Sequence, residues 1–64
     1  MEKAKFVVVV LVGGEWVKCA EHALEHYARA EALDAFEDAE VEAVEVRVMA
    51  DNVVLMREGG WWLP

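Results

Sequence analysis

The residues with the clearest potential for chemistry are a cysteine and two histidines in the first half of the chain. Cys19, His22 and His26 follow one another at spacings of three and four residues, with Glu15 four residues before the cysteine. Histidines at positions i and i+4 of a helix can chelate a divalent metal ion. On a helix, however, Cys19 and His26 would be about 10.5 Å apart along the axis, whereas zinc–ligand bonds are only about 2.0–2.3 Å long. A closed site would therefore need ligands from another chain, and the simpler interpretation is a solvated helix face.

The same cysteine and histidine could in principle form a nucleophile and its base. A reactive cysteine needs electropositive surroundings that favour the thiolate, but Glu15 and the net charge of −7 have the opposite effect. No third group that would orient a base is evident. The acidic run at residues 37–42 lacks the calcium-loop pattern, so it is interpreted as a solvated connection. We therefore predict no enzyme activity and no cofactor.

Tryptophans are the third group of interest. Trp61 and Trp62 follow a Gly59-Gly60 pair near the end of the sequence, whereas Trp16 lies in the apolar stripe of a predicted helix. A terminal aromatic pair either covers the core or contacts a neighbouring chain, since aromatic residues are favoured interface anchors. The alternative is a flat, flavin-type ring bound between tryptophans of symmetry-related copies.

The element that would position all these groups is an apolar segment at residues 5–12. Four consecutive valines predict a strand, and successive side chains of a strand point to opposite faces. Both faces are apolar, with Phe6, Val8, Val10 and Val12 on one and Val7, Val9 and Leu11 on the other. Gly13 and Gly14 end the strand.

A helix is predicted from Glu15 to a point between Glu31 and Asp34, where acidic residues interrupt its apolar stripe. A single helix that continues to Ala39 is the alternative, because no glycine or proline enforces a break.

Two further strands are predicted in the second half. Residues 41–50 alternate between apolar and mixed positions, and Asp51 and Asn52 suit a two-residue hairpin turn. Such a turn would pair Val46 with Arg57 and would place Val54 and Met56 on the reverse face of the last strand.

The predicted fold is thus a single α+β domain over residues 1–64, in the order β-α-β-β. One amphipathic helix packs on a three-stranded sheet of order 1-3-2, followed by a Gly-Gly turn and a tryptophan-rich tail. A right-handed crossover would make the first two strands parallel and leave the first at an edge. Because long apolar edges pair with other chains, we predict a homo-oligomer. Its predicted interface is Val7, Val9, Leu11, Val54, Met56, Trp61 and Trp62.

Composition limits the other classes of partner. The chain is 58% hydrophobic with a pI near 4.6, which argues against nucleic acids and anionic membranes as partners. No run approaches the roughly 20 apolar residues that span a bilayer, and no targeting signal is recognised, so a cytoplasmic location is expected. One cysteine excludes an internal disulfide.

The residue alphabet suggests an origin. Ser, Thr, Gln and Ile are absent, while Ala, Val and Glu make up half of the chain. Surface Ala and Glu with Val-rich strands are habits of propensity-driven design. We therefore hypothesise a de novo designed or synthetic sequence, and a GC-rich thermophilic genome is the natural alternative.

Two family resemblances complete the sequence evidence. Residues 53–64, Val-Val-Leu-Met-Arg-Glu-Gly-Gly-Trp-Trp-Leu-Pro, resemble the strand that leads into the catalytic helix of Nudix hydrolases. The catalytic box of that family has no counterpart in this chain. The order β-α-β-β is similar to that of dodecins, small oligomers that bind flavin, and residues 33–37 resemble the segment before their second strand. Ala35 and Phe36 occupy the neighbourhood in which that family carries its flavin-stacking tryptophan.

Overall fold

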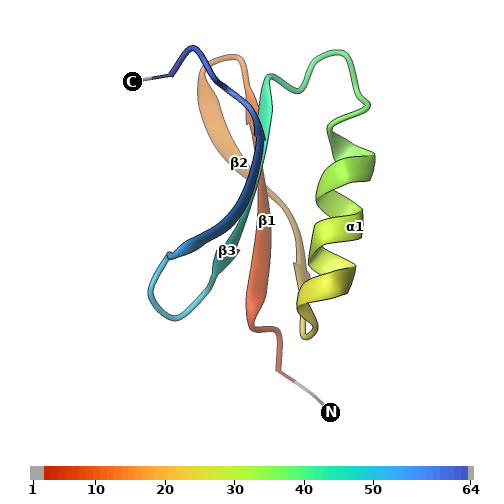
Figure 1. Ribbon diagram of the computed structural model, residues 1–64, viewed down its shortest axis with the longest axis vertical. Helices are drawn as coiled ribbons and strands as arrows, with labels where there is room; N and C mark the ends of the chain where they lie inside the picture. The colour runs from red at the N-terminus through yellow and green to blue at the C-terminus, as the bar shows by residue number, and fades with distance from the viewer. Residues whose placement is uncertain (1–2, 64) are drawn as a thin grey trace.

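The chain folds into one antiparallel sheet with a single helix on one of its faces. A computed structural model describes residues 3–63. The elements are β1 (Phe6–Val12), β2 (Glu15–His22), α1 (Glu25–Ala35), β3 (Ala43–Val48) and β4 (Val54–Gly59). The sheet has the order β2-β1-β3-β4 with every neighbouring pair antiparallel (Figure 1). The α+β class is confirmed, whereas the three-stranded sheet of order 1-3-2 is wrong.

The largest correction concerns residues 15–22, which form β2 and not the first half of a helix. Gly13 and Gly14 have φ values of 59° and 80°. Two successive positive φ values are the mark of a type I′ turn, whose twist matches that of a hairpin. The chain therefore reverses at once and pairs Leu11 with Trp16. As a result the order is ββαββ, no parallel crossover forms, and β1 is a central strand with neighbours on both sides.

Helix α1 begins ten residues later than predicted and ends at Ala35, one residue beyond the predicted limit. Its first turn carries Glu25, which suits the positive end of the helix dipole. The two residues of α1 that are fully buried are Ala28 and Ala32, four positions apart on one face. Their small side chains let the helix lie close to the sheet.

The connection between β3 and β4 is longer than the predicted two-residue turn. Asn52 has a φ of 60°, in agreement with its predicted place in a turn. The connection nevertheless contains all five residues from 49 to 53. Its ends are joined by a hydrogen bond from the Val48 amide to the Val53 carbonyl, 2.9 Å. The register therefore pairs Val46 with Met56 and Glu45 with Arg57, one residue away from the predicted pairing. The last strand is an edge strand and not the centre of the sheet.

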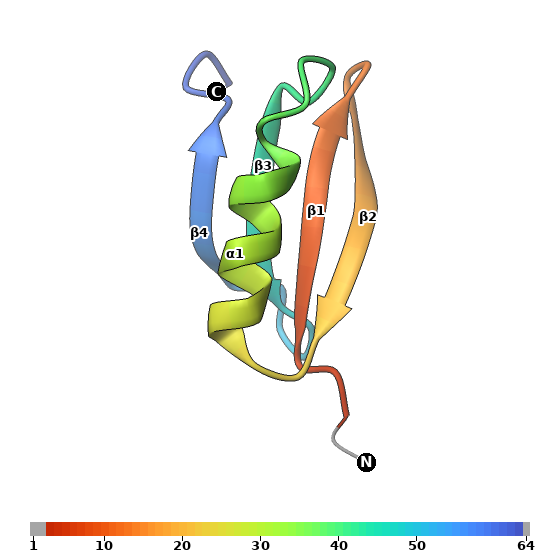
Figure 2. The same cartoon turned by 90° about the vertical axis from the view of Figure 1, so that its right-hand side faces the viewer.

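The hydrophobic core lies between α1 and the sheet, where Figure 2 shows the helix lying along β1 and β3. Its buried members are Val8, Val10, Ala28, Ala32, Val44 and Val46. Around them pack the partly buried Phe6, Val12, Ala20, Ala35, Val41 and Met56. Within residues 3–63, no helix has the length and apolar character needed to cross a membrane.

Candidate functional site

The cysteine and histidines that motivated a metal site do not share a helix face. Cys19 lies in β2, where the register with β1 passes directly from Lys18 to Ala20, so the cysteine occupies an irregularity of the strand and is exposed. His22 is the last residue of β2, and His26 is in the first turn of α1. The helical spacing on which both the metal and the nucleophile hypotheses depended is therefore wrong. In the described part of the chain, no three His, Cys, Asp or Glu side chains are grouped as metal ligands would be.

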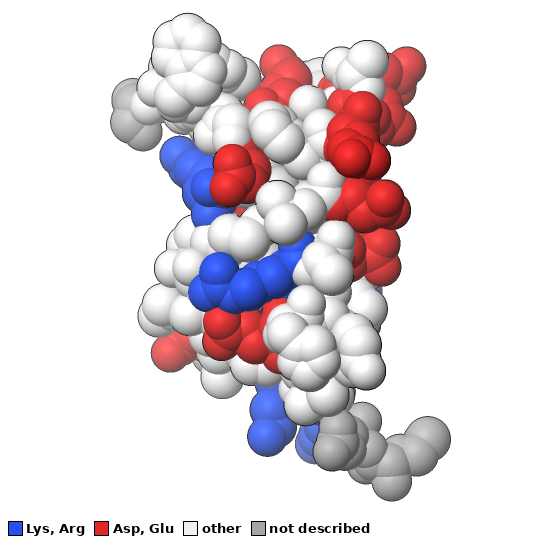
Figure 3. All heavy atoms as spheres, turned by 45° about the vertical axis from the view of Figure 1, so that its right-hand side comes forward, with Lys and Arg blue, Asp and Glu red and all other residues white. Residues whose placement is uncertain are grey.

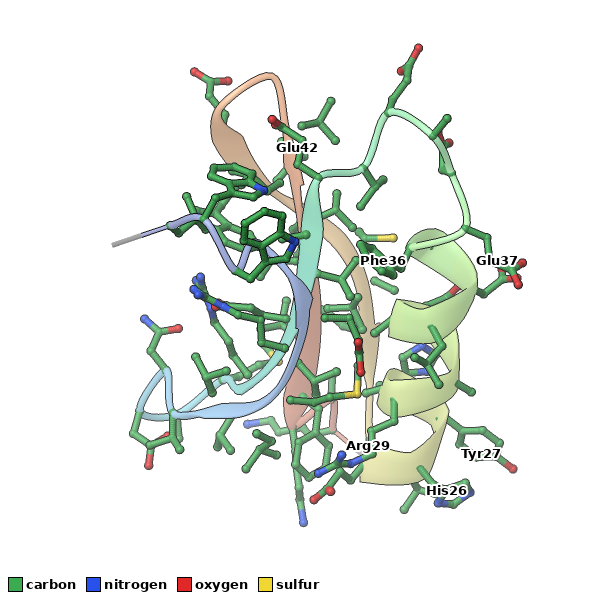
Figure 4. All side chains as sticks on the ribbon, turned by 45° about the horizontal axis from the view of Figure 1, so that its top comes forward. His26, Tyr27, Arg29, Phe36, Glu37 and Glu42 are labelled. Atoms are coloured by element: carbon green, nitrogen blue, oxygen red, sulfur yellow. The ribbon has the colours of Figure 1, made fainter. Side chains whose placement is uncertain are left out.

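The histidines instead lie where β2 meets the start of α1. The His22 Nε2 atom is 3.4 Å from the Glu31 carboxylate but makes no hydrogen bond within residues 3–63. The ring of Tyr27 is near both histidines, with centroid distances of 6.4 Å to His22 and 4.2 Å to His26. Figure 4 shows His26 and Tyr27 on the outer side of the first helical turn.

The sheet face opposite α1, here called the second face, carries the predicted interface residues Val7, Val9 and Leu11. Val9 and Leu11 are only 8% and 3% exposed, and Val7 is partly covered. Met56, also predicted on that face, packs against the core under the helix. Val9 and Leu11 are therefore covered by the chain itself, whereas Val7 and Met56 are covered only in part.

A group of charged and aromatic side chains covers the second face. Glu45 is 2% exposed and lies between Arg47 and Arg57. The Arg47 Nε and Nη2 atoms lie 2.8 and 2.6 Å from Glu45 Oε1. The corresponding Arg57 atoms lie 2.7 and 2.6 Å from Oε2. Both guanidinium groups lie over the ring of Trp16, at 5.3 and 5.9 Å from its centroid.

This cluster gives the buried Glu45 carboxylate hydrogen-bond partners, and its three side chains together carry one net positive charge. Each oxygen of Glu45 has its own arginine, which is the arrangement that makes a buried ion pair tolerable. Sequence reasoning missed the cluster because it placed Trp16 on a helix. One signal was present: two glycines between apolar runs are a hairpin pattern, and a hairpin there brings Trp16 beside β1.

The C-terminal tail, residues 60–63, crosses the second face after β4. A Cβ atom at Gly60 would lie 3.0 Å from the Ala43 Cβ and from the Leu63 side chain, so the backbone runs close over Ala43. The tail turns through a hydrogen bond from the Leu63 amide to the Gly60 carbonyl, 2.9 Å. On this turn Trp61 is 89% exposed and Trp62 is 49% exposed. Pro64, the last residue of the predicted tail, lies outside the described residues.

Other large apolar side chains are also exposed, and several lie on the edge strands or in the loops beside them. Val17 is on β2, Val54 is on β4, and Val53 precedes β4. The remaining exposed members are Leu24, Tyr27, Leu33, Phe36 and Met49. Of the predicted interface, Val54, Trp61 and Trp62 thus remain accessible.

An apolar depression of about 530 Å³ opens at the end of the sheet remote from the tail. It is lined by Ala4, Lys5, Phe6, Val48, Met49 and Ala50. These residues flank the start of β1 and the end of β3, which are joined there by a hydrogen bond from the Met49 amide to the Lys5 carbonyl, 2.9 Å. Figure 1 shows this end of the sheet at the bottom and the tail at the top.

Charge is distributed unevenly along the same axis. The loop at residues 36–42 lies at the same end of the molecule as the tail. Two hydrogen bonds hold it to the end of β1 and the turn that follows. The Glu42 amide donates to the Leu11 carbonyl at 2.8 Å, and the Gly14 amide donates to the Glu42 carboxylate at 3.2 Å. This end carries the acidic side chains Glu15, Glu37, Asp38, Glu40, Glu42 and Glu58. Figure 3 shows red acidic side chains gathered at this upper end and down the helix side with fewer lower down, and blue side chains near the tail, across the middle and at the lower end. Lys5, on the rim of the depression, is exposed.

The structure also bears on the two family resemblances. The resemblance to dodecins depends on the order β-α-β-β, and the chain has the order ββαββ. The segment that resembles the Nudix strand is the edge strand β4 with the tail behind it. Comparison of the chain with protein-family models, with curated proteins and with solved structures found no match.

Proposed function

We propose that the protein is a non-enzymatic module whose role is to associate with further copies of itself. The observation that carries this proposal is Trp61, a large apolar side chain that is 89% exposed. Tryptophan is enriched among the few residues that supply most of the binding energy in interfaces. Trp62 beside it is half exposed. The tail therefore presents two indole rings to solvent, and the ring of Trp61 is almost uncovered.

The edges of the sheet support the same proposal. The outer sides of β2 and β4 have no strand beside them within residues 3–63, and each carries an exposed valine, Val17 or Val54. Unpaired strand edges present backbone donors and acceptors to other chains. A 64-residue chain also buries only about 60% of its unfolded surface, so association would add burial that the monomer lacks.

The charge of the chain limits how this association can occur. A net charge of −7 opposes contact between copies in arbitrary orientations. Contacts that place the arginine and lysine side chains of one copy near the acids of another are favoured over the rest. Self-association is therefore proposed as a specific contact and not as general adhesion between apolar surfaces.

Light scattering of the protein after size-exclusion chromatography, over a hundredfold range of concentration, tests the proposal. We expect the mean mass to rise above that of the 7.2 kDa chain as concentration increases. Leu33→Ala, which truncates an exposed helix residue, is the control and should behave like the unchanged protein. A constant mass of one chain up to about 1 mM, the weakest affinity of practical interest, would overturn the proposal.

A second candidate function is the binding of a flat aromatic ligand by the tail. Its support is that both Trp61 and Trp62 offer ring surface to solvent on one short turn, and aromatic rings stack on one another. Titration with a free flavin, followed by tryptophan fluorescence, tests it. Saturable quenching that is lost in the Trp61→Ala and Trp62→Ala variants is expected for ligand binding, whereas linear quenching in all three proteins excludes it.

A further inference from the structure

The two ends of the molecule have complementary shapes and chemistry. One end has the apolar depression of about 530 Å³ between the start of β1 and the end of β3. The other end has the tail with Trp61, which packs on little of its own chain. A concave apolar site of a few hundred Å³ is the size that accepts a small molecule or a large side chain, and an indole is the largest apolar side chain that this protein exposes.

We propose that copies of this chain assemble head to tail, with Trp61 of one copy inserted into the depression of the next. This inference rests on the proposed self-association and specifies its geometry. The contact joins two different surfaces of the chain, so it is heterologous, and each added copy presents a new Trp61 and a new depression. Repetition of such a contact produces a ring when the rotation closes and a filament when it does not.

Several observations favour a second copy as the occupant of the depression. The molecule extends 36 Å along its longest axis. Figure 1 shows the tail at one end and, at the other end, the start of β1 and the end of β3, whose residues line the depression. A copy therefore cannot fill its own depression with its own Trp61. The lining is apolar apart from Lys5, which matches an indole and not a charged or strongly polar ligand.

Charge complementarity gives the contact its direction. Lys5 lines the depression, Lys3 is exposed two residues before it, and the one acidic residue that adjoins the lining in sequence is Asp51, which follows Ala50. The tail end carries Glu58 immediately before the two glycines and the acidic loop at residues 36–42. In a head-to-tail contact these acids approach the lysines of the neighbouring copy. In a tail-to-tail contact the same acids would face one another, which is unfavourable.

A mixing experiment with two single variants tests the geometry. Trp61→Ala removes the inserted side chain and keeps the depression, whereas Ala50→Glu places a carboxylate in the depression and keeps Trp61. Ala50 is exposed in the loop between β3 and β4, so the substitution spares the core. We expect the Kd for self-association of each variant alone to be at least about 30-fold higher than that of the unchanged protein, which is the effect of losing a binding hot spot. Mixed in equal amounts, they should form a one-to-one heterodimer by native mass spectrometry, because one intact contact is restored.

The outcomes separate this inference from the proposed function. If both variants associate like the unchanged protein, the head-to-tail contact is wrong while self-association stands. If each is monomeric and the mixture is also monomeric, the two positions do not meet in one contact.

If Val54→Lys on the β4 edge abolishes association and Trp61→Ala does not, copies pair through strand edges. A small molecule that the unchanged monomer retains and Ala50→Glu loses would show that the depression has another occupant. An unchanged protein that is always monomeric overturns both proposals.

Discussion

The two faces of the sheet are covered in different ways. Under α1 the core cluster is apolar, with Val44 and Val46 of β3 fully buried against Ala28 and Ala32 of the helix. On the second face no helix or strand among residues 3–63 covers the sheet. There Leu11 is paired with Trp16 and Ala43, Val9 is paired with Glu45, and the two arginines bind Glu45 and lie over Trp16.

The difference explains how so short and apolar a chain covers both sides of a sheet with one helix. Arginine side chains can place their methylene groups on an apolar surface while their charged ends remain accessible, and here Trp16 lies beneath both. The second face thereby acquires Glu45, the one buried carboxylate among residues 3–63. The helix side depends on close packing of small residues, and the second face depends on a charge balance. The two faces should therefore respond to different substitutions.

The largest effect is expected when the charge balance of the second face is broken. The double variant Arg47→Met and Arg57→Met leaves the Glu45 carboxylate buried without either partner, and loss of partners around a buried charge costs about 3–5 kcal/mol. Urea unfolding measures the change. Replacing Glu45 by leucine in the same background should restore most of the stability, since an apolar triad is often as stable as the ionic one. If that third substitution restores nothing, the arginines act through packing and not through the carboxylate.

On the helix side, loss of packing should matter next most. Val46→Ala removes two methyl groups from a fully buried position, which corresponds to about 2–3 kcal/mol when the transfer and cavity contributions are combined. The matched control is Val54→Ala, at an exposed position of β4, where a change within about 0.5 kcal/mol is expected. Equal losses of unfolding free energy in the two variants would show that the core is not located under α1.

A smaller effect is expected at the point where the chain passes from β4 to the second face. Gly59 has a φ of 75°, and a Cβ atom there would lie 2.6 Å from the Glu42 carbonyl and 2.7 Å from the Phe36 ring. Gly14 has a φ of 80° with open space around it. Gly14→Ala should cost about 1 kcal/mol from backbone strain alone, and Gly59→Ala should cost about 2 kcal/mol because contact is added to strain. Thermal unfolding of both variants measures the difference, and equal costs would mean that the end of β4 is not held against the loop at residues 36–42.

The smallest change in stability is expected at Trp61, which covers neither face. Because its side chain is almost fully exposed, Trp61→Ala should alter the unfolding free energy of the monomer by less than about 0.5 kcal/mol. Unfolding followed by circular dichroism at a concentration low enough for dissociation measures this. A loss above about 1 kcal/mol would show that Trp61 packs on its own chain.

Much of the sheet was predictable from alternation and turn residues. The strand at residues 5–12, the opposite placement of Val8 and Val9, and strands on both sides of Asn52 all follow from patterns that the structure retains. The register of the last hairpin could not be predicted in the same way. The length of a hairpin loop decides which residues pair, and Asp51 and Asn52 are compatible with loops of two residues and of five.

The prediction of a helix at residues 15–22 failed for a physical reason. Trp16, Ala20 and Ala23 fit the spacing of a helix stripe, but Gly13 and Gly14 allow a tight hairpin that pairs this segment with the most apolar strand. Pairing and packing then outweigh local propensity. The Glu45 cluster could not be predicted from the mixed alternation of residues 45–49, because an outward glutamate and a buried, paired one have the same pattern in sequence.

Small-angle X-ray scattering over a concentration series tests the head-to-tail account most directly. A single copy measures 36 × 22 × 16 Å along its principal axes. If Trp61 inserts into the depression of the next copy, the maximum dimension should rise by roughly the long axis with each copy added, while the cross-section stays constant, or reach a plateau if a ring closes. Growth in the cross-section with little change in the maximum dimension, as side-by-side pairing of strand edges would produce, would contradict it.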